Sequence, residues 1–107
     1  MTLVRLCNVV DVPEGEVRRF EFDHRPIAVV NLGDEGFRAI DAICSHAHYF
    51  LDEGEVEAEF ATIECPKHGS TFNLDTGMPT TLPATSPVEV FPVKIENDDV
   101  LIEVTDE

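Results

Sequence analysis

The chain has 107 residues, which suits one domain that buries roughly 65% of its unfolded surface. With 22 acidic residues against 7 Lys and Arg, the net charge of −15 makes nucleic acid and anionic membrane surfaces poor partners. No apolar run reaches the ~18 residues that a transmembrane helix needs, and the first residues lack the pattern of a signal peptide. Three cysteines, an odd number, do not suggest a disulfide framework, so a reducing cytoplasm is the expected compartment.

Short strands are the elements that the sequence predicts from end to end. Alternating or β-branched apolar runs recur between clusters of Gly, Pro, Asn and Asp, and a helical period is conceivable only at 50–58. Frequent turns between short strands predict a single all-β domain over residues 1–107, an antiparallel sandwich or barrel. In chain order the expected strands are 2–7, 16–22, 27–32, 37–43, 61–64, 70–74, 88–96 and 100–104.

Two segments between these strands hold side chains that bind metals. They are Cys44-Ser45-His46 and Cys65-Pro66-Lys67-His68, each with one thiolate and one imidazole. The single residue between Cys44 and His46 is tight for one tetrahedral ion, because closed zinc sites use more widely spaced pairs. A two-iron cluster removes this difficulty, since each segment can send its Cys to one iron and its His to the other. Two Cys and two His are the ligand set of a Rieske [2Fe–2S] centre.

The expected chemistry of such a centre is one-electron transfer. Two ferric ions, two sulfides, two thiolates and two neutral imidazoles sum to zero charge, whereas a four-Cys cluster in the same state carries minus two. The less negative centre accepts an electron more readily, so that His ligation raises the reduction potential. From the residues alone, three other interpretations stay open: a structural zinc site, a Cys–His hydrolase without a recognisable nucleophile signature, and Cys and His residues that share no site.

Beyond these segments, the chain resembles the small Rieske ferredoxins that serve bacterial ring-hydroxylating dioxygenases, such as the biphenyl type. The resemblance implies a β-sandwich or barrel base and a smaller cluster-binding subdomain, approximately residues 42–83. It implies that Cys44 and Cys65 bind the inner iron, and that His46 and His68 bind the outer iron near the surface where a partner docks. The resemblance runs nearly end to end, through 6–7, 11–16, 44–46, 51–54, 65–69, 72, 76–77, 90–95 and 99–101.

The resemblance also implies residues that surround the cluster. Gly69 would let the backbone approach the sulfides closely, because glycine has no Cβ. Pro83 lies in a Pro-containing stretch, 82–87, that resembles a third loop over the cluster, although an ordinary stiff connection is the alternative. Ser70 and Phe72 occupy positions where high-potential Rieske proteins have Ser and Tyr hydroxyl donors, so only the Ser donor remains here.

Two departures argue against the respiratory class of Rieske proteins. Members of that class carry an additional Cys in each ligand loop, and the two form a disulfide. In this chain the matching positions are Tyr49 and Lys67. Of the other candidate groups, Cys7 is expected to be a small buried hydrophobic residue and His48 an exposed loop residue.

The function predicted from this pattern is that of a one-electron carrier, not an enzyme by itself. The expected partners are a flavin-dependent ferredoxin reductase and a terminal non-haem iron oxygenase, and the chain is expected to be a monomer. Its acidic surface would steer it to a basic patch on a redox partner, keep it soluble, or do both. Two alternatives remain: a Rieske subunit of another system, such as cluster assembly or a nitrite-reductase-like complex, and a metal-binding redox sensor.

Overall fold

The computed structural model describes residues 2–44, 49–66, 69–80 and 86–104. Within these ranges the chain is all-β, as predicted, with three 3₁₀ turns, η1 (Val9–Asp11), η2 (Gly33–Glu35) and η3 (Leu51–Glu53). None of the described residues forms a helix long and apolar enough to cross a membrane. The strands are β1 (Thr2–Asn8), β2 (Val17–Phe22), β3 (Arg25–Asn31), β4 (Phe37–Asp41), β5 (Val56–Glu57), β6 (Thr62–Glu64), β7 (Thr71–Asn73), β8 (Val90–Phe91), β9 (Val93–Glu96) and β10 (Asp99–Val104).

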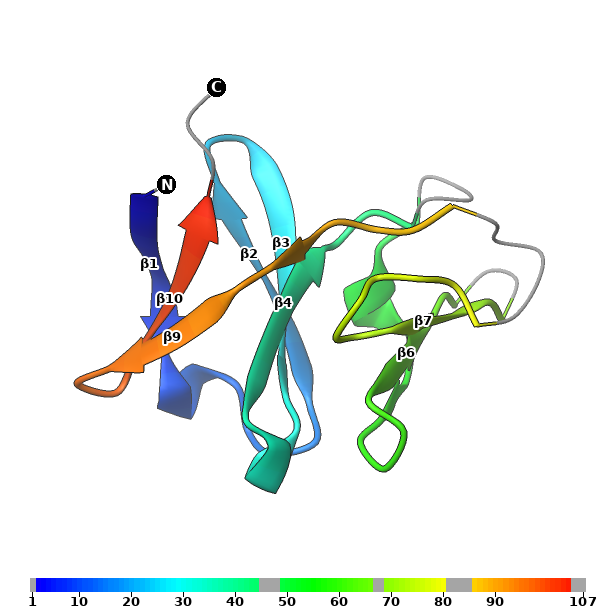
Figure 1. Cartoon of the computed structure of the whole chain (residues 1–107), viewed down its shortest axis with the longest axis horizontal. Helices are drawn as coiled ribbons and strands as arrows, with labels where there is room; N and C mark the ends of the chain where they lie inside the picture. Colours follow the sequence, from blue (N-terminus) through cyan, green and yellow to red (C-terminus); the bar gives the residue numbers. More distant parts are fainter. Residues whose placement is uncertain (1, 45–48, 67–68, 81–85, 105–107) are drawn as a thin grey trace.

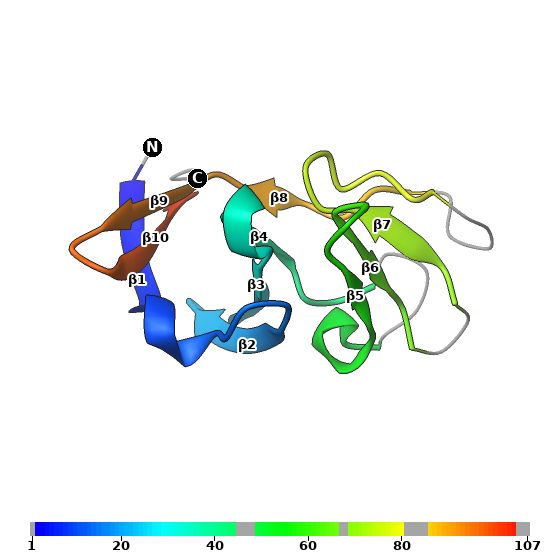
Figure 2. The same cartoon turned by 90° about the horizontal axis from the view of Figure 1, so that it is seen from below.

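The strands form three antiparallel sheets that lie in a row. Their strand orders are β1-β10-β9, β2-β3-β4-β8 and β5-β6-β7. Figures 1 and 2 place the four-stranded sheet in the middle, with β1-β10-β9 on one side and β5-β6-β7 on the other. The middle sheet therefore packs against both flanking sheets, and its two faces contribute residues to separate cores.

Strand β3 shows why the middle sheet needs apolar residues on both faces. Its residues Ile27 to Val30 are all buried, with no polar residue between them. Ile27 and Val29 pack toward β1 and β10, in what we call the first core. Ala28 and Val30 pack the other way, in what we call the second core. A continuous apolar run, in place of strict alternation, is typical of a strand covered on both sides.

The two cores have different members. The first core consists of two clusters that both contact Leu6 and Val93. One cluster holds the buried residues Ile27, Ala39, Phe91, Ile102 and Val104, and the other holds Cys7, Val12, Val29 and Val100. The second core holds Ala28, Val30, Leu32, Ile40, Ala42, Cys44, Leu51, Ile63, Cys65, Phe72, Leu74 and Val88. Both predicted thiolate ligands thus belong to the second core, which joins the middle sheet to β5-β6-β7.

One expected strand is divided in the structure. The sequence predicts a continuous strand over 88–96, but Pro92 separates β8 from β9. Proline has no N–H to donate to a sheet, so it suits the point where the chain changes partners. Strand β8 pairs with β4 in the middle sheet, and β9 pairs with β10 in the first sheet.

Candidate metal centre

The two predicted cysteine ligands begin two equivalent loops. The N–H of Cys44 donates to the carbonyl of Tyr49 over 2.9 Å, and the N–H of Cys65 donates to the carbonyl of Ser70 over 2.6 Å. Each bond links a cysteine to the residue five positions on. A β-bridge between Ile43 and Phe50 closes the first loop from behind, and the pairing of β6 with β7 closes the second. The chain therefore presents both cysteines at the ends of two hairpin-like structures.

The histidines of the two motifs belong to these same loops by sequence. His46 lies between Cys44 and Tyr49, and His68 lies between Cys65 and Ser70, but both are outside the described residues. Pro83, the predicted member of the covering loop, is outside them as well. The roles of these three residues stay predictions.

The surroundings of the two thiols fit a metal cluster. Cys44 is 3% exposed and Cys65 is fully buried, and both sit among the apolar side chains of the second core. Two thiolates in such a place are costly unless cations compensate their charge, and two ferric ions supply that charge. Beside the second loop, Gly69 has a φ of +74°, and a Cβ added there would meet no described atom within 4 Å. As far as the described residues go, a group could therefore lie next to the backbone there.

The other two residues expected near the cluster are fully buried. Ser70 is the one buried polar residue among those that the structure describes, and Phe72 belongs to the second core. Phe72 lies on β7, directly beyond the second loop, and pairs with Ile63 across the sheet. Its ring excludes water from the same core that holds Cys44 and Cys65. The structure thus gathers Cys44, Cys65 and Phe72 in one core, and bonds Ser70 through its backbone to Cys65.

The backbone at Gly54 lies in close contact with the backbone at Glu64, just before the second loop. A Cβ added to Gly54 would lie 1.7 Å from the carbonyl oxygen of Glu64, the residue before Cys65. The N–H of Glu64 donates to the carbonyl of Glu55 over 2.8 Å, so the chain after Gly54 runs against β6. Only a residue without a side chain fits there. The sequence offered Gly54 as part of a family motif, without this steric reason.

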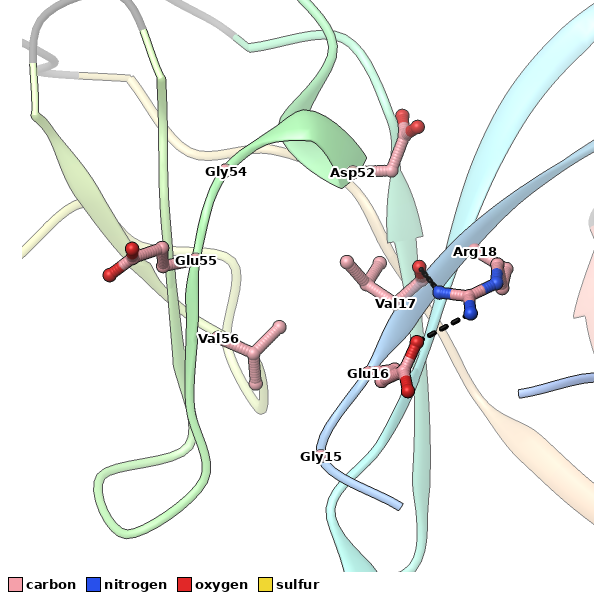
Figure 3. A pocket seen from close by; sticks show the side chains of 8 residues that line it. All are labelled: Gly15, Glu16, Val17, Arg18, Asp52, Gly54, Glu55 and Val56. Carbon is pink, nitrogen blue, oxygen red and sulfur yellow. Dashed lines mark hydrogen bonds and ion pairs between the residues drawn. The ribbon is translucent and has the colours of Figure 1, made fainter. Parts of the chain in front are cut away.

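A surface cleft separates β2 from the segment that follows the first loop. It has a volume of about 400 Å³ and is lined by the eight residues drawn in Figure 3. Val17 of β2 and Val56 of β5 project into the space between the two segments, and Asp52 stands at the η3 end (Figure 3). Arg18 bonds to Glu16 and to the carbonyl of Val17, which keeps it on the β2 side. No signal in the sequence predicted this cleft.

Cys7 is buried in the first core, as expected, away from the two ligand loops. Burial raises the pKa of its thiol to about 11, and the nearby carboxylate of Asp11 adds to the rise. None of the three cysteines forms a disulfide. A thiol that keeps its proton so firmly is a poor metal ligand or nucleophile.

Iodoacetamide is expected to label Cys7 slowly in the native protein. With the pKa near 11 instead of 9.0, the thiolate fraction at about pH 8 is about a hundredfold lower. The stability that the protonated thiol contributes is intact below about pH 9 and falls as the pH rises through 11. Mass spectrometry of labelled peptides measures the rate, and labelling of Cys7 as fast in buffer as in urea would contradict this expectation.

Comparison with protein families matches residues 2–92 to the family described as Rieske [2Fe-2S] domain. The chain belongs to the Rieske [2Fe–2S] family. It therefore carries one [2Fe–2S] cluster, and the interpretations as a zinc site, a hydrolase or an unconnected set of Cys and His are set aside. Its role is that of a one-electron carrier.

Individual relatives place this Rieske protein among the ferredoxins of aromatic ring-hydroxylating dioxygenase systems. It is 44% identical over 105 residues to the 3-phenylpropionate/cinnamic acid dioxygenase ferredoxin subunit of Escherichia coli K12, covering 97% of this chain and 95% of that one. It matches the ferredoxin of carbazole 1,9a-dioxygenase from Nocardioides aromaticivorans IC177 at a TM-score of 0.89 and 34% identity, covering 95% and 97% of the two chains. These similarities confirm the predicted Rieske fold.

A third comparison concerns an assembly. The chain matches a structure described as a complex of reduced oxygenase and oxidized ferredoxin in carbazole 1,9a-dioxygenase. The TM-score is 0.85 at 36% identity, with 94% of this chain and 91% of that one covered. In that system, a ferredoxin and its oxygenase form a complex.

Proposed function

We propose that this Rieske ferredoxin takes electrons from a flavin-dependent ferredoxin reductase and delivers them to a terminal non-haem iron oxygenase. The observation that carries the proposal is the pair of buried cysteines at equivalent positions of two loops. The assembly of a similar ferredoxin with an oxygenase supports the acceptor, and the 44% identical dioxygenase subunit supports the kind of system. The substrate of the oxygenase is outside what this chain's residues determine.

We propose Cys44 and Cys65 as the ligands of one iron and His46 and His68 as the ligands of the other. When bound, the cluster supplies reversible one-electron chemistry. The burial of Cys44 and Cys65 supports the inner position for the iron that they bind. Gly69 would leave room beside the cluster, and the hydroxyl of Ser70 is near enough along the chain to tune it.

We further propose a single domain over residues 1–107 with a cluster-binding subdomain at about 42–83. Sheet β5-β6-β7 and the two ligand loops fall within the proposed subdomain. Pro83 would belong to its covering loop. We also propose a monomer in the cytoplasm, where a reducing environment suits the buried thiol of Cys7.

The proposed function is tested by electron delivery in both directions. The purified protein is mixed with NADH and the flavoprotein reductase of a phenylpropionate dioxygenase system, and bleaching of the visible absorption is followed. The reduced protein is then mixed anaerobically with the oxygenase of the same system, and recovery of the absorption is followed. We expect both steps to be fast. The opposite outcome is that dithionite reduces the protein but neither the reductase nor the oxygenase exchanges electrons with it. The protein would then be a redox sensor or the subunit of another system.

Salt is expected to slow the reaction with the reductase. The chain carries a net charge of −15, so a partner with a basic patch is attracted over long distances. Between about 0.01 M and 1 M ionic strength the screening length falls from about 30 Å to about 3 Å, and steered association slows on the order of tenfold. Stopped-flow measurement of the second-order rate constant tests this, with a small neutral reductant as the control. A rate constant that is flat across this range would mean that the acidic surface serves solubility alone.

A further inference from the structure

Arg19 of β2 contacts the segment that follows the first ligand loop in two ways. Its guanidinium carbon lies 3.8 Å from the centroid of the Phe50 ring. Its Nη1 lies 3.8 Å from Oδ1 of Asp52. Arginine is suited to such a double contact, because its planar guanidinium stacks on an aromatic face and keeps its edges for a carboxylate. One side chain of the middle sheet therefore holds two residues of the loop segment.

Asp52 depends on this contact for its charge balance. Its Oδ1 is buried and accepts no hydrogen bond from any residue that the structure describes. Its side chain is 14% exposed, against 38% for that of Arg19. A carboxylate so placed is unfavourable without a compensating charge, and among the described residues Arg19 is the cation paired with it. The ion pair is thus worth more here than a pair between two fully exposed side chains.

Phe50 connects this contact to the first ligand loop. It forms the β-bridge with Ile43, the residue directly before Cys44. The neighbouring Tyr49 accepts the N–H of Cys44, and the N–H of Leu51 donates to Ala42 over 2.7 Å. Displacement of Phe50 would therefore be transmitted to the backbone of Ala42, Ile43 and Cys44.

Strand β2 presents Arg19 on the face that meets the second core. Val17, two residues earlier and hence on the same face of the strand, packs against the second core that contains Cys44 and Cys65. Phe20, on the opposite face, packs against the first core. The position of Arg19 is therefore set by the alternation of β2.

We propose that Arg19 is a positioning residue for electron transfer: between Phe50 and Asp52, it anchors the first ligand loop to the middle sheet and offsets the charge of Asp52, whose neighbour Leu51 packs in the core that holds Cys44 and Cys65. The role rests on the proposed assignment of Cys44 and His46 as ligands. Arg19 itself acts through Phe50 and Asp52, and we assign it no contact with the cluster.

Four variants of the cluster-loaded protein separate the two parts of this role. Arg19→Met removes both the charge and the planar group, whereas Arg19→Lys keeps the charge and loses the planar group. Asp52→Asn removes the charge of the partner. Arg5→Met is the matched control, because it also removes one positive charge from an ion pair, in this case with Asp99 at 2.8 Å. That pair lies in sheet β1-β10-β9, which Figure 1 places at the far end of the molecule from β5-β6-β7.

Two measurements are made on each protein: the midpoint potential by voltammetry, and the rate at which the visible absorption bleaches in the presence of an iron chelator. Arg19→Met is expected to disfavour reduction about threefold, a shift of about −28 mV at 59 mV per tenfold. Asp52→Asn is expected to shift the potential by a similar amount in the opposite direction. Arg19→Lys is expected to keep the potential but lose the cluster about fivefold faster, because the ring contact is weakened.

The control decides the interpretation. Arg5→Met should leave both the potential and the bleaching rate as in the unaltered protein, and circular dichroism reports any global loss of stability that the variants share. If Arg19→Met matches Arg5→Met in both measurements, the proposed role of Arg19 is wrong. If Arg19→Met does not fold, an unchanged bleaching rate in Arg19→Lys together with an unchanged potential in Asp52→Asn overturns it equally. Absence of a Rieske-type electron paramagnetic resonance signal in the unaltered protein would instead refute the proposed ligands.

Discussion

Cys44→Ala and Cys65→Ala proteins are expected to contain almost no iron and no acid-labile sulfide, whereas a Cys7→Ala protein keeps the full amount of both. Loss of one thiolate removes a strong ligand and leaves only three of the four proposed ligands for the two irons. The colour of the purified protein, iron determination and sulfide determination measure this result directly.

Cys7→Ala is a matched control because all three cysteines are equally inaccessible. Cys7 is 3% exposed, Cys44 is 3% exposed and Cys65 is fully buried. Each change removes one buried sulfur, at about 1 kcal/mol for the packing alone. Any larger difference between the variants therefore reports metal ligation. Full iron content in Cys44→Ala or Cys65→Ala would show that the proposed ligands are wrong.

The histidine ligands are tested in the same way. His46→Ala or His68→Ala is expected to abolish the Rieske-type signal of the reduced protein, because two nitrogen ligands on one iron are what distinguish this centre from a four-Cys cluster. His24→Ala is the control, since His24 occupies an exposed turn between β2 and β3 with a φ of +65°. Stoichiometric zinc in protein produced anaerobically with ample iron would contradict the whole assignment.

Gly54→Ala is expected to lower the free energy of unfolding by about 3 kcal/mol or more, and to reduce cluster loading with it. The added Cβ would lie 1.7 Å from the carbonyl oxygen of Glu64, so the backbone of β6 or of the segment before β5 must move. Glu64 precedes Cys65, and the movement would reach the second ligand loop. The φ of Gly54 is −92°, so the effect is steric and not a matter of left-handed backbone strain.

Gly15→Ala separates this steric effect from the general effect of replacing a glycine. Gly15 has a φ of +80°, and a Cβ there would meet no described atom within 4 Å. Its replacement is expected to cost about 1 kcal/mol through backbone strain alone. Urea unfolding of both proteins gives the comparison, with iron content as a second measurement. Equal unfolding free energies for the two variants would mean that the backbone of β6 at Glu64 can shift at little energetic cost.

Much of the architecture could be predicted from local patterns in the chain. Alternation of buried and partly exposed side chains, as in Asp99–Val104, depends on neighbouring residues alone. It can therefore be recognised without the rest of the fold. The same holds for turns such as Gly33–Glu35, where glycine supplies the unusual backbone angle. The C-x-H and C-x-x-H spacings likewise restrict which metal sites can form, and they indicate the Rieske family by themselves.

Other features depend on residues that are far apart in the chain. The run over 88–96 looks like one strand, and only the pairing of its two halves with β4 and β10 shows that Pro92 divides it. The equivalence of the two ligand loops appears in the hydrogen bonds of Cys44 and Cys65, because the segments between their ligands differ in length. Sequence spacing alone does not reveal this likeness.

By itself, therefore, the sequence determined the all-β class, most strand positions and the family, since each rests on residue types and short spacings. The tertiary structure decided which faces are buried and which backbones touch. Gly54 is needed only because Glu64 lies against it, and Arg19 gains its role only because β2 packs beside Phe50 and Asp52. Neither contact can be recognised from the neighbouring residues in the sequence. Each joins two segments that come together only because the second core as a whole is buried between them.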